Sequence, residues 1–383
     1  MKIDKQNPVH WALLTIFSIN TILCLLLTIF QKPNRKRVLL YGHKLNGNLK
    51  ALYDYYQKES NHEVFYLALD LAYSKDLRNS NIRVLSAINP LDIYYVCRSR
   101  VIVTDHGPLS LIFLIWLKKY IFIDVWHGIP FKGFDAKDFR YHHKYDYTLV
   151  TSKLLKNFYI DKFGFNDNQV VVTGYGRTDH LVKKDLNPES LRKKYGLDET
   201  DRKIVLYAPT WNHNNPDHQS RPLGIEPRAF LEQLSSYATR TGISFIYRSH
   251  LNVDIDMGKY VNIRFFPASI YPDTEELLYI SDVLICDWSS IAFDFLLLKR
   301  PVLFIDCEPP FQKSLTLGSD FRFGPLIKDM RNLLGELSVA CESPAKILGK
   351  FEDQMLSVRE TVYDNNADGH ATKRYAELID SVA

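Results

Sequence analysis

Short apolar runs alternating with helical patterns constrain this chain of 383 residues more than any other feature. Near-continuous apolar runs of about five residues are typical of parallel strands that helices cover on both faces. Strands that alternate with helices predict a doubly wound parallel sheet. The predicted strands of the first sheet are Arg37–Tyr41, Val64–Ala68, Val101–Thr104, Ile121–Val125, Tyr147–Thr151 and Gln169–Val172.

A polar stretch, Lys183–Lys203, interrupts this pattern before it starts again. The length of the chain suits two domains of ordinary size. We therefore expect one α/β domain over residues 37–195 and a second over residues 196–383. Because ligands bind beyond the carboxyl ends of parallel strands, we also expect a cleft between the domains. The predicted strands of the second sheet are Ile204–Ala208, Ser244–Tyr247, Ile263–Phe265, Val283–Cys286 and Val302–Ile305.

The segment Trp11–Phe30 contains no charged residue. As a helix it would reach roughly 30 Å, the thickness of the hydrocarbon core of a bilayer. The basic cluster that follows, Lys32 and Arg35 to Arg37, is stronger than the pair Lys2 and Lys5 before it. Positive flanks stay on the cytoplasmic side, so residues 1–36 are predicted to anchor the protein at the cytoplasmic face of the cell membrane. The alternative is a buried helix of a soluble fold.

The charge and the cysteines exclude several other classes of function. A net charge of +4 is too small to indicate a nucleic-acid partner. The five cysteines are scattered, and no pair has the spacing of a metal or redox site. The chain also lacks a Walker loop and a G-x-G-x-x-G turn after its first predicted strand. We expect neither a metal nor a cofactor.

The turn Cys286–Ser290 follows a buried strand, and Ser289 and Ser290 open the next predicted helix. Free backbone N–H groups make a helix N-terminus suitable for phosphate, and serine hydroxyls add donors. The alternative is that one serine only caps the helix.

Four further segments place polar groups after predicted strands. His127 follows Ile121–Val125 and could act as a general base, with Lys132 close enough to contact an anion. The alternative is a histidine with a structural role only. The remaining candidates are Thr210 in Ala208–Trp211, Arg248 and His250 on one extended segment, and Arg177 in the turn Gly174–Asp179.

The order of these motifs resembles the CDP-glycerol glycerophosphotransferases of teichoic-acid and related polymer synthesis. The resemblance rests on W-H-G-x-P-x-K at Trp126–Lys132, A-P-T-W at Ala208–Trp211, R-x-H at Arg248–His250 and S-D-x-L-I-x-D-x-S-S at Ser281–Ser290. The segments Phe293–Phe295 and Lys299–Pro301 also fit this family.

The resemblance implies two Rossmann-like domains of the GT-B type and a transfer of glycerol phosphate from CDP-glycerol. The acceptor would be a hydroxyl of a lipid-linked saccharide or of a growing polyol-phosphate chain, and CMP would be released. By matching motifs, His127 would be the catalytic base, and His250 would be catalytic in stabilising the diphosphate or the leaving CMP. The residues implied in donor or phosphate binding are Arg248, Ser289, Ser290, Asp287, Thr210, Arg177 and Lys132.

Three positions depart from the family pattern. Asn212 stands where the family usually has Arg, and Leu251 stands where it usually has Pro. The family's G-x-P-R-N-D turn reads Gly-Tyr-Gly-Arg-Thr-Asp at Gly174–Asp179. Two other functions therefore stay open: a GT-B glycosyltransferase or polyol-phosphate transferase with another donor such as CDP-ribitol, and an inactive membrane-tethered homologue.

Overall fold

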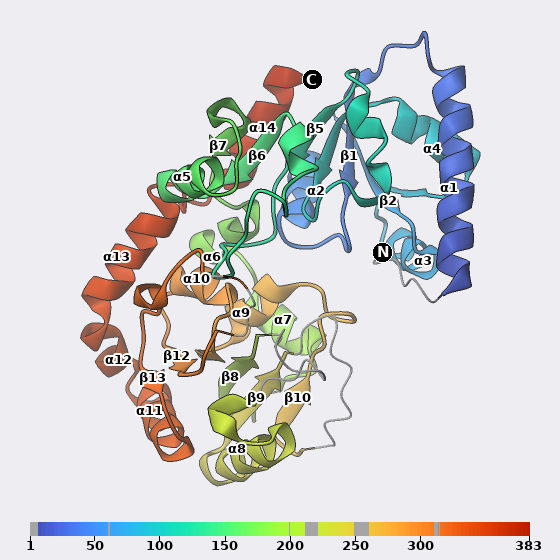
Figure 1. Cartoon of the computed structure of the whole chain (residues 1–383). Coiled ribbons are helices and arrows are strands. Elements are labelled where there is room, and N and C mark those ends of the chain that lie inside the picture. Colours follow the sequence, from blue (N-terminus) through green and yellow to red (C-terminus); the bar gives the residue numbers. More distant parts are fainter. Residues whose placement is uncertain are drawn as a thin grey trace. The chain divides into compact units, whose positions relative to one another are not determined.

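The computed structural model describes residues 7–59, 62–198, 200–210, 221–248, 260–309, 313 and 315–383. The chain forms two compact units (Figure 1). Unit 1 comprises residues 1–127, 135–179 and 370–383, and unit 2 comprises residues 128–134 and 180–369.

Unit 1 contains a parallel sheet of seven strands in the order β3-β2-β1-β4-β5-β6-β7. Its helices are α1 (Pro8–Leu27), α2 (Gly47–Glu59), α3 (Leu71–Asn79), α4 (Pro90–Cys97), α5 (Lys153–Asp161) and α14 (Ala371–Val382). Its strands are β1 (Asn34–Tyr41), β2 (Glu63–Ala68), β3 (Val84–Ser86), β4 (Ser99–Thr104), β5 (Ile121–Asp124), β6 (Tyr147–Val150) and β7 (Val170–Val172).

Unit 2 contains a parallel sheet of six strands in the order β10-β9-β8-β11-β12-β13. Its strands are β8 (Lys203–Ala208), β9 (Ile243–Tyr247), β10 (Ile263–Phe265), β11 (Val283–Cys286), β12 (Val302–Ile305) and β13 (Leu326–Ile327). The helices are α6 (Asp179–Lys183, which starts at the last residue of this part of unit 1), α7 (Pro188–Lys194), α8 (Pro227–Thr241), α9 (Thr274–Ile280), α10 (Ile291–Leu296), α11 (Met330–Glu342), α12 (Pro344–Lys350) and α13 (Glu352–Tyr363).

Both faces of the first sheet are buried, which explains why β1 is apolar at consecutive positions. Side chains alternate between the two faces of a strand. Val38 and Leu40 pack with residues of α2 and α14 on one face, whereas Leu39 and Tyr41 pack with residues of α1 and α4 on the other. The predicted doubly wound α/β architecture is confirmed for this unit.

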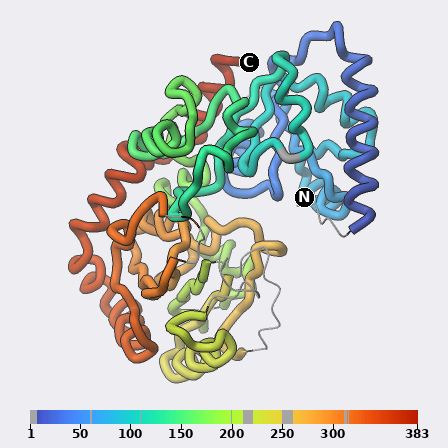
Figure 2. Tube along the Cα trace, in the orientation of Figure 1, coloured from blue at the N-terminus to red at the C-terminus, as the bar shows by residue number. Residues whose placement is uncertain are grey.

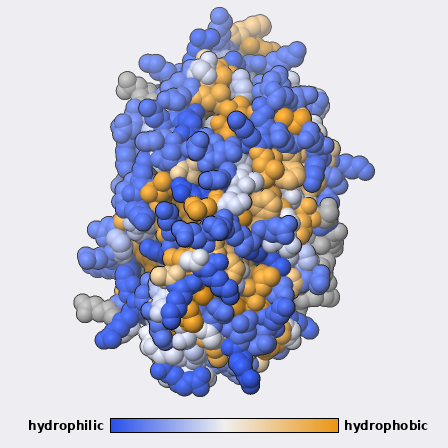
Figure 3. Space-filling view, turned by 90° about the vertical axis from the view of Figure 1, so that its left-hand side faces the viewer, coloured by the Kyte–Doolittle hydropathy of each residue, from blue (hydrophilic) through white to orange (hydrophobic). Residues whose placement is uncertain are grey.

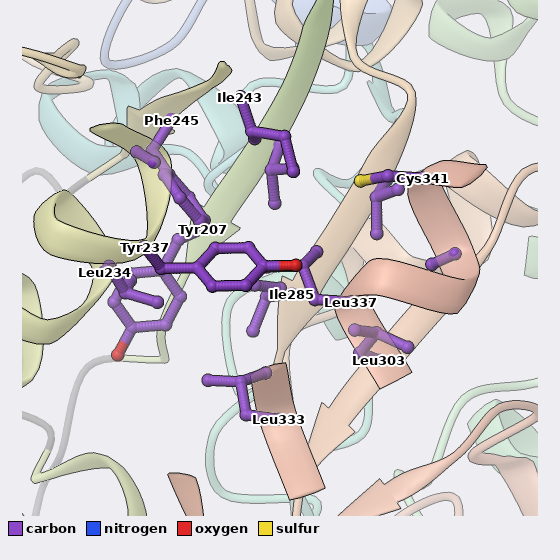
Figure 4. Packing of buried hydrophobic residues seen from close by; sticks show 14 of the residues in the cluster. Tyr207, Leu234, Tyr237, Ile243, Phe245, Ile285, Leu303, Leu333, Leu337 and Cys341 are labelled. Atoms are coloured by element: carbon purple, nitrogen blue, oxygen red, sulfur yellow. The ribbon is translucent and has the colours of Figure 1, made fainter. Parts of the chain in front are cut away.

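The core of unit 2 follows the same principle (Figure 4). Tyr207 on β8, Ile285 on β11 and Leu303 on β12 point toward the residues of α8 and α11, among them Leu234 and Leu337. All of these side chains are buried. The second predicted α/β sheet is therefore also confirmed.

The two units differ from the predicted domain boundaries at residues 36/37 and 195/196. Helix α1 belongs to unit 1, whose middle segment ends at Asp179, and residues 370–383 return to unit 1. Figures 1 and 2 show this return, with α14 in red beside the blue and green segments. The physical reason is the apolar face of α14, which buries Tyr375, Ala376 and Ile379 against α2 and the first sheet.

Helix α14 is fixed to the turn Gly174–Asp179 by buried polar contacts. The carboxylate of Asp179 accepts hydrogen bonds from the backbone N–H groups of Ala371 (3.0 Å) and Thr372 (2.9 Å) at the start of the helix. The hydroxyl of Tyr375 accepts from the N–H of Gly176 (3.1 Å) and donates to the carbonyl of Gly174 (3.0 Å). The last helix thereby shapes a turn that the sequence indicated as functional.

We predict that Tyr375→Phe lowers the free energy of unfolding by about 1–3 kcal/mol, because the buried N–H of Gly176 loses its partner, whereas the carbonyl of Gly174 still accepts from the Thr173 hydroxyl at 3.1 Å. Urea denaturation followed by circular dichroism measures this loss. The matched control is Lys373→Ala on the same helix, whose side chain is 59% exposed. An unchanged midpoint for Tyr375→Phe would contradict the proposed anchoring of the turn.

Candidate active site

His127 projects from the loop after β5, and its neighbour Trp126 sets its direction. Trp126 adopts a φ of +48°, a conformation that costs a non-glycine residue about 1–3 kcal/mol and is typical of functional sites. Its N–H donates to Asp124 Oδ1 at 3.2 Å, and its buried ring packs 5.4 Å from the ring of Phe139. Burying Trp126 leaves the next side chain, His127, exposed.

The hydrogen bond of the His127 ring defines which nitrogen can act as a base. Nδ1 lies 3.1 Å from the carbonyl oxygen of Asp105. A carbonyl can only accept, so Nδ1 carries the hydrogen and Nε2 keeps its lone pair. Surrounding protein lowers the pKa of His127 well below its ordinary value of 6.5, and the nearby charge of His106 lowers it further. The ring is solvent-exposed, so water moderates both effects, but both favour the neutral base at pH 7.

Asn48, near the start of α2, connects the His127 loop to the turn that contains Arg177. Its side-chain amide donates to the carbonyls of Val125 (2.8 Å) and Trp126 (2.9 Å). Its Oδ1 accepts from the N–H of Arg177 at 3.0 Å. Arg177 in turn donates from its guanidinium to the carbonyl of His127 at 2.5 Å. The structure therefore brings together the predicted residues His127 and Arg177, with Asn48 holding both segments.

The buried groups behind His127 include Asp124 and His142. Burial raises the pKa of Asp124 to about 8, so this carboxyl is largely protonated at neutral pH. Burial lowers the pKa of His142 to about 4, so its ring is neutral there. The two side chains lie 4.0 Å apart, and both support Trp126. The protein interior directly behind the His127 loop is therefore largely uncharged at neutral pH.

In unit 2, Asp287 joins the ends of β8 and β11. Its Oδ1 accepts from the N–H of Thr210 at 2.9 Å, from the N–H of Trp288 at 2.6 Å and from the Thr210 hydroxyl. Burial raises the pKa of Asp287, and the hydrogen bonds from Thr210 oppose that shift. Asp287 and Thr210, both predicted to bind the donor, thus bind each other and fix the two strand ends side by side.

Ser289 and Ser290 lie partly exposed between that junction and α10. Ser290 occupies the N-cap position of α10, yet its side chain makes no capping hydrogen bond within the described part of the chain. The alternative reading of Ser290 as a side-chain cap therefore does not hold. Trp288 beside them is anchored, since its indole N–H donates to the carbonyl of Cys307 at 2.9 Å.

Arg248 points toward the segment before α9. Its guanidinium donates to the carbonyl of Tyr271 (2.8 Å) and to the hydroxyl of Thr274 (2.7 Å). Burial lowers the pKa of Arg248, and the charge of Glu275 opposes this effect. These contacts give Arg248 an organising role at the end of β9. His250, like Trp211, Asn212 and Leu251, lies outside the described residues.

His127 and Lys132 share one sequence motif but belong to different units. The ring of Phe131 packs 4.7 Å from that of Phe293 and 5.7 Å from that of Trp288. The hydroxyl of Thr316 donates to the carbonyl of Lys132 at 2.7 Å. Lys132 is therefore held within unit 2, together with the turn that contains the two serines.

Sequence reasoning missed Asn48, Asp105 and His106. A usable signal existed for two of them, because Asp105 and His106 directly follow the buried strand β4, as His127 follows β5. Asn48 carried no such signal, since its partners lie far away in the sequence. Among the described residues, no group of three or more His, Cys, Asp or Glu is arranged to hold a metal ion.

We predict that Asn48→Asp loosens both segments that Asn48 connects. The substitution keeps the size of the side chain but removes the N–H donors and turns a carboxylate toward two carbonyls. Hydrogen exchange should become faster in peptides covering residues 124–130 and 174–179. Lys50→Ala, a partly exposed position on the same helix, is the control. Unchanged exchange in both peptides would contradict the connecting role.

Comparisons with known proteins agree on one family. A sequence model described as CDP-Glycerol:Poly(glycerophosphate) glycerophosphotransferase matches residues 25–380. The chain is 27% identical over 336 residues to the teichoic acid poly(glycerol phosphate) polymerase of Bacillus spizizenii, covering 79% of this chain and 83% of that protein. It is 28% identical over 295 residues to the teichoic acid glycerol-phosphate primase of Bacillus subtilis, covering 71% and 74%. The chain spans only 46% of the longer Bacillus subtilis poly(glycerol phosphate) polymerase.

The structure agrees with this assignment at the level of the fold. A solved structure of the wall teichoic acid polymerase TagF superposes with a TM-score of 0.74 at 20% identity, covering 94% of this chain and 92% of that one. The predicted GT-B-like fold is confirmed by this likeness. Because the family model spans most of its length, the chain belongs to the CDP-glycerol:poly(glycerophosphate) glycerophosphotransferase family.

Proposed function

We propose that this protein transfers glycerol phosphate from CDP-glycerol to a hydroxyl of a lipid-linked saccharide or of a growing polyol-phosphate chain, releasing CMP, in the synthesis of teichoic acid or a related cell-surface polymer. One observation carries the chemistry: the exposed ring of His127 has Nδ1 bonded to the Asp105 carbonyl, which leaves Nε2 able to accept a proton. Family membership supplies the class of donor.

The proposed reaction moves one proton and exchanges one P–O bond. The acceptor hydroxyl gives its proton to His127 Nε2 while its oxygen forms a bond to the phosphorus that carries glycerol. The bond from that phosphorus to the bridging oxygen of the diphosphate breaks, and CMP leaves with the electron pair. A positioned general base contributes about 10²–10⁴-fold to such a step.

Unit 2 is proposed to bind the donor. Negative charge builds on the departing CMP, and fixed donors that stabilise it supply most of the catalysis in phosphoryl transfer. Ser289 and Ser290 offer hydroxyls beside an ordered strand-end junction, and Lys132 adds a cation held in the same unit. His250 remains a proposed catalytic partner. Arg248 and Asp287 are proposed to shape this site through the contacts that they make with Thr274 and Thr210.

The polyol of the donor is the point on which a second candidate has support. The relatives include the teichoic acid ribitol-phosphate primase of Bacillus spizizenii, 25% identical over 321 residues. Asn212 and Leu251 depart from the family pattern near the donor motifs. CDP-ribitol is therefore the alternative donor. The remaining alternatives are a glycosyltransferase, which would transfer a sugar, and an inactive homologue.

A donor panel tests this proposal. Purified full-length protein is incubated with CDP-glycerol, CDP-ribitol or a UDP-sugar and with membrane extract as acceptor. We expect CMP release with CDP-glycerol and a lipid-linked product whose mass increases by glycerol-phosphate units. His127→Ala should lower turnover by about 10²–10⁴-fold while CDP-glycerol binding, measured by calorimetry, is kept.

Each contrary outcome has a distinct meaning. CMP release with CDP-ribitol alone would show that the donor is CDP-ribitol and not CDP-glycerol. Turnover of His127→Ala near that of the wild type would reject the base. Binding of CDP-glycerol without any CMP release from the wild-type protein, across all acceptors, would favour the inactive homologue.

We further propose that α1 attaches the protein to the cytoplasmic face of the cell membrane by lying along it. Helix α1 is long and apolar enough to cross a membrane, and 17% of its most apolar window is buried. Phe17 and Cys24 pack into the core of unit 1 beside α4, and Asn20 donates to the carbonyl of Ile88 at 3.2 Å. A spanning helix would have to give up these contacts.

The opposite side of α1 is apolar and exposed. Its exposed large side chains are Val9, Trp11, Ile16, Ile19, Ile22, Leu23, Leu26 and Leu27, followed by Ile29 and Phe30, and α4 adds Leu91 and Tyr95. The exposed cations Lys32, Arg35 and Lys36 follow directly. An apolar helix face with adjacent cations is typical of binding in the plane of an anionic membrane surface. By contrast, the face drawn in Figure 3 is mostly hydrophilic, with hydrophobic areas between.

The double variant Leu23→Glu with Leu26→Glu tests this attachment, because both side chains are more than half exposed. We expect it to lose flotation with anionic liposomes while thermal unfolding stays near that of the wild type. Leu356→Glu, at an exposed position of α13, is the control. Wild-type protein that resists alkaline extraction from cell membranes would indicate a spanning helix. Flotation of the double variant would show that the exposed apolar side of α1 is not the membrane-binding surface.

A further inference from the structure

A second histidine, His106, stacks on the face of His127. The ring centroids lie 4.3 Å apart, and the ring planes differ by only 7°. His106 is the second residue after β4, so the carboxyl ends of the neighbouring strands β4 and β5 present the two rings next to each other. Neither family membership nor the chemistry proposed for His127 assigns a role to this second ring.

Asp105 holds both rings with different atoms. Its backbone carbonyl accepts from His127 Nδ1 at 3.1 Å, and its carboxylate Oδ1 lies 2.7 Å from His106 Nδ1. The Asp105 side chain is only 5% exposed. Gly42, after β1, makes room for it, because a Cβ at that position would overlap Asp105 Oδ1. The first turn of the sheet therefore contributes space for the pair.

The surroundings of His106 favour a charged ring. Burial alone would lower the pKa of His106, but the charge and the close contact of Asp105 outweigh burial, so the pKa is raised above its ordinary value. The ring of His43 also lies close to that of His106, with the ring centroids 4.5 Å apart. For His127, the charged and titratable neighbours are His106, Arg177 and His43, and each opposes protonation.

We propose that His106 is a positioning residue of the transfer reaction: paired with Asp105, it presents a cationic ring to the face of His127 and keeps His127 a neutral, correctly oriented base. This role rests on the proposed function of His127. A ring stacked at this distance restricts rotation of His127, while the Asp105 carbonyl fixes its tautomer. The positive charge on His106 makes a second positive charge on His127 unfavourable.

The pH dependence of the reaction separates this role from a merely structural one. A neighbouring cation lowers the pKa of His127, so removing the cation should raise that pKa. The acid limb of kcat/KM reports the base of the free enzyme. In His106→Phe, which keeps an aromatic ring without charge, we expect the acid limb to move upward by about one pH unit. His106→Gln, which is neutral and not aromatic, should move it in the same direction.

A second readout does not depend on turnover. Ring-labelled histidine in the full-length protein gives an NMR titration of His127, assigned by its loss in His127→Asn. Its midpoint should rise in His106→Phe by the same amount as the acid limb. His180→Gln is the matched control, because the side chain of His180 is partly exposed and paired with Asp185 at 2.7 Å, so its loss should leave both readouts unchanged.

The outcomes are distinguishable. A His127 midpoint that is unmoved, or lowered, in both His106 variants would overturn the proposal, whatever their activity. Lower turnover with an unmoved midpoint would leave His106 a structural residue. If His127→Ala kept its turnover, the base assignment would fall, whereas the NMR titration would still measure the effect of His106 on His127.

Discussion

The position of the candidate base His127 depends on the hydrogen bonds of the Asn48 side chain. Its amide occupies two carbonyls of the His127 loop and one N–H of the Arg177 turn. All three backbone groups lie where regular strands have ended, so no ladder partner satisfies them. A buried amide group can supply donors and an acceptor at once. The loop after β5 can therefore depart from regular geometry, including the positive φ of Trp126, and still hold His127 in one direction.

Unit 2 uses the same device with a carboxylate. Asp287 joins the ends of β8 and β11 by accepting from Thr210 and Trp288. Asp287 therefore holds the strand ends in place, and the partly exposed serines next to them are not needed to do so. Arg248 similarly orders the approach to α9 through Tyr271 and Thr274. Some residues that the sequence suggested as donor-binding residues thus make structural contacts that hold the strand ends in place.

The sequence predicted the sheets well because burial on both faces leaves a direct trace. Val38 to Tyr41 are all buried, and they are all apolar. It predicted the positions of His127 and Ser290 because polar residues after buried strands are visible in one dimension. It could not predict that residues 370–383 join the first unit. Tyr375 bonds to Gly174 and Gly176, and both glycines lie much earlier in the chain. Asp105 and His106 were visible by the rule applied to His127, but their stacking arises only from the pairing of β4 with β5.

The late position of α14 in the sequence has a consequence for the order of synthesis. The ribosome releases the whole first sheet and then all of residues 180–369 before α14 emerges. Until then, the face that carries Val38 and Leu40 lacks the cover that α14 provides. Unit 2, being nearly continuous in sequence, can complete its core first, although domains usually fold from the N-terminus onward. A nascent chain therefore cannot complete the turn around Arg177 until α14 has been synthesised and has docked on unit 1.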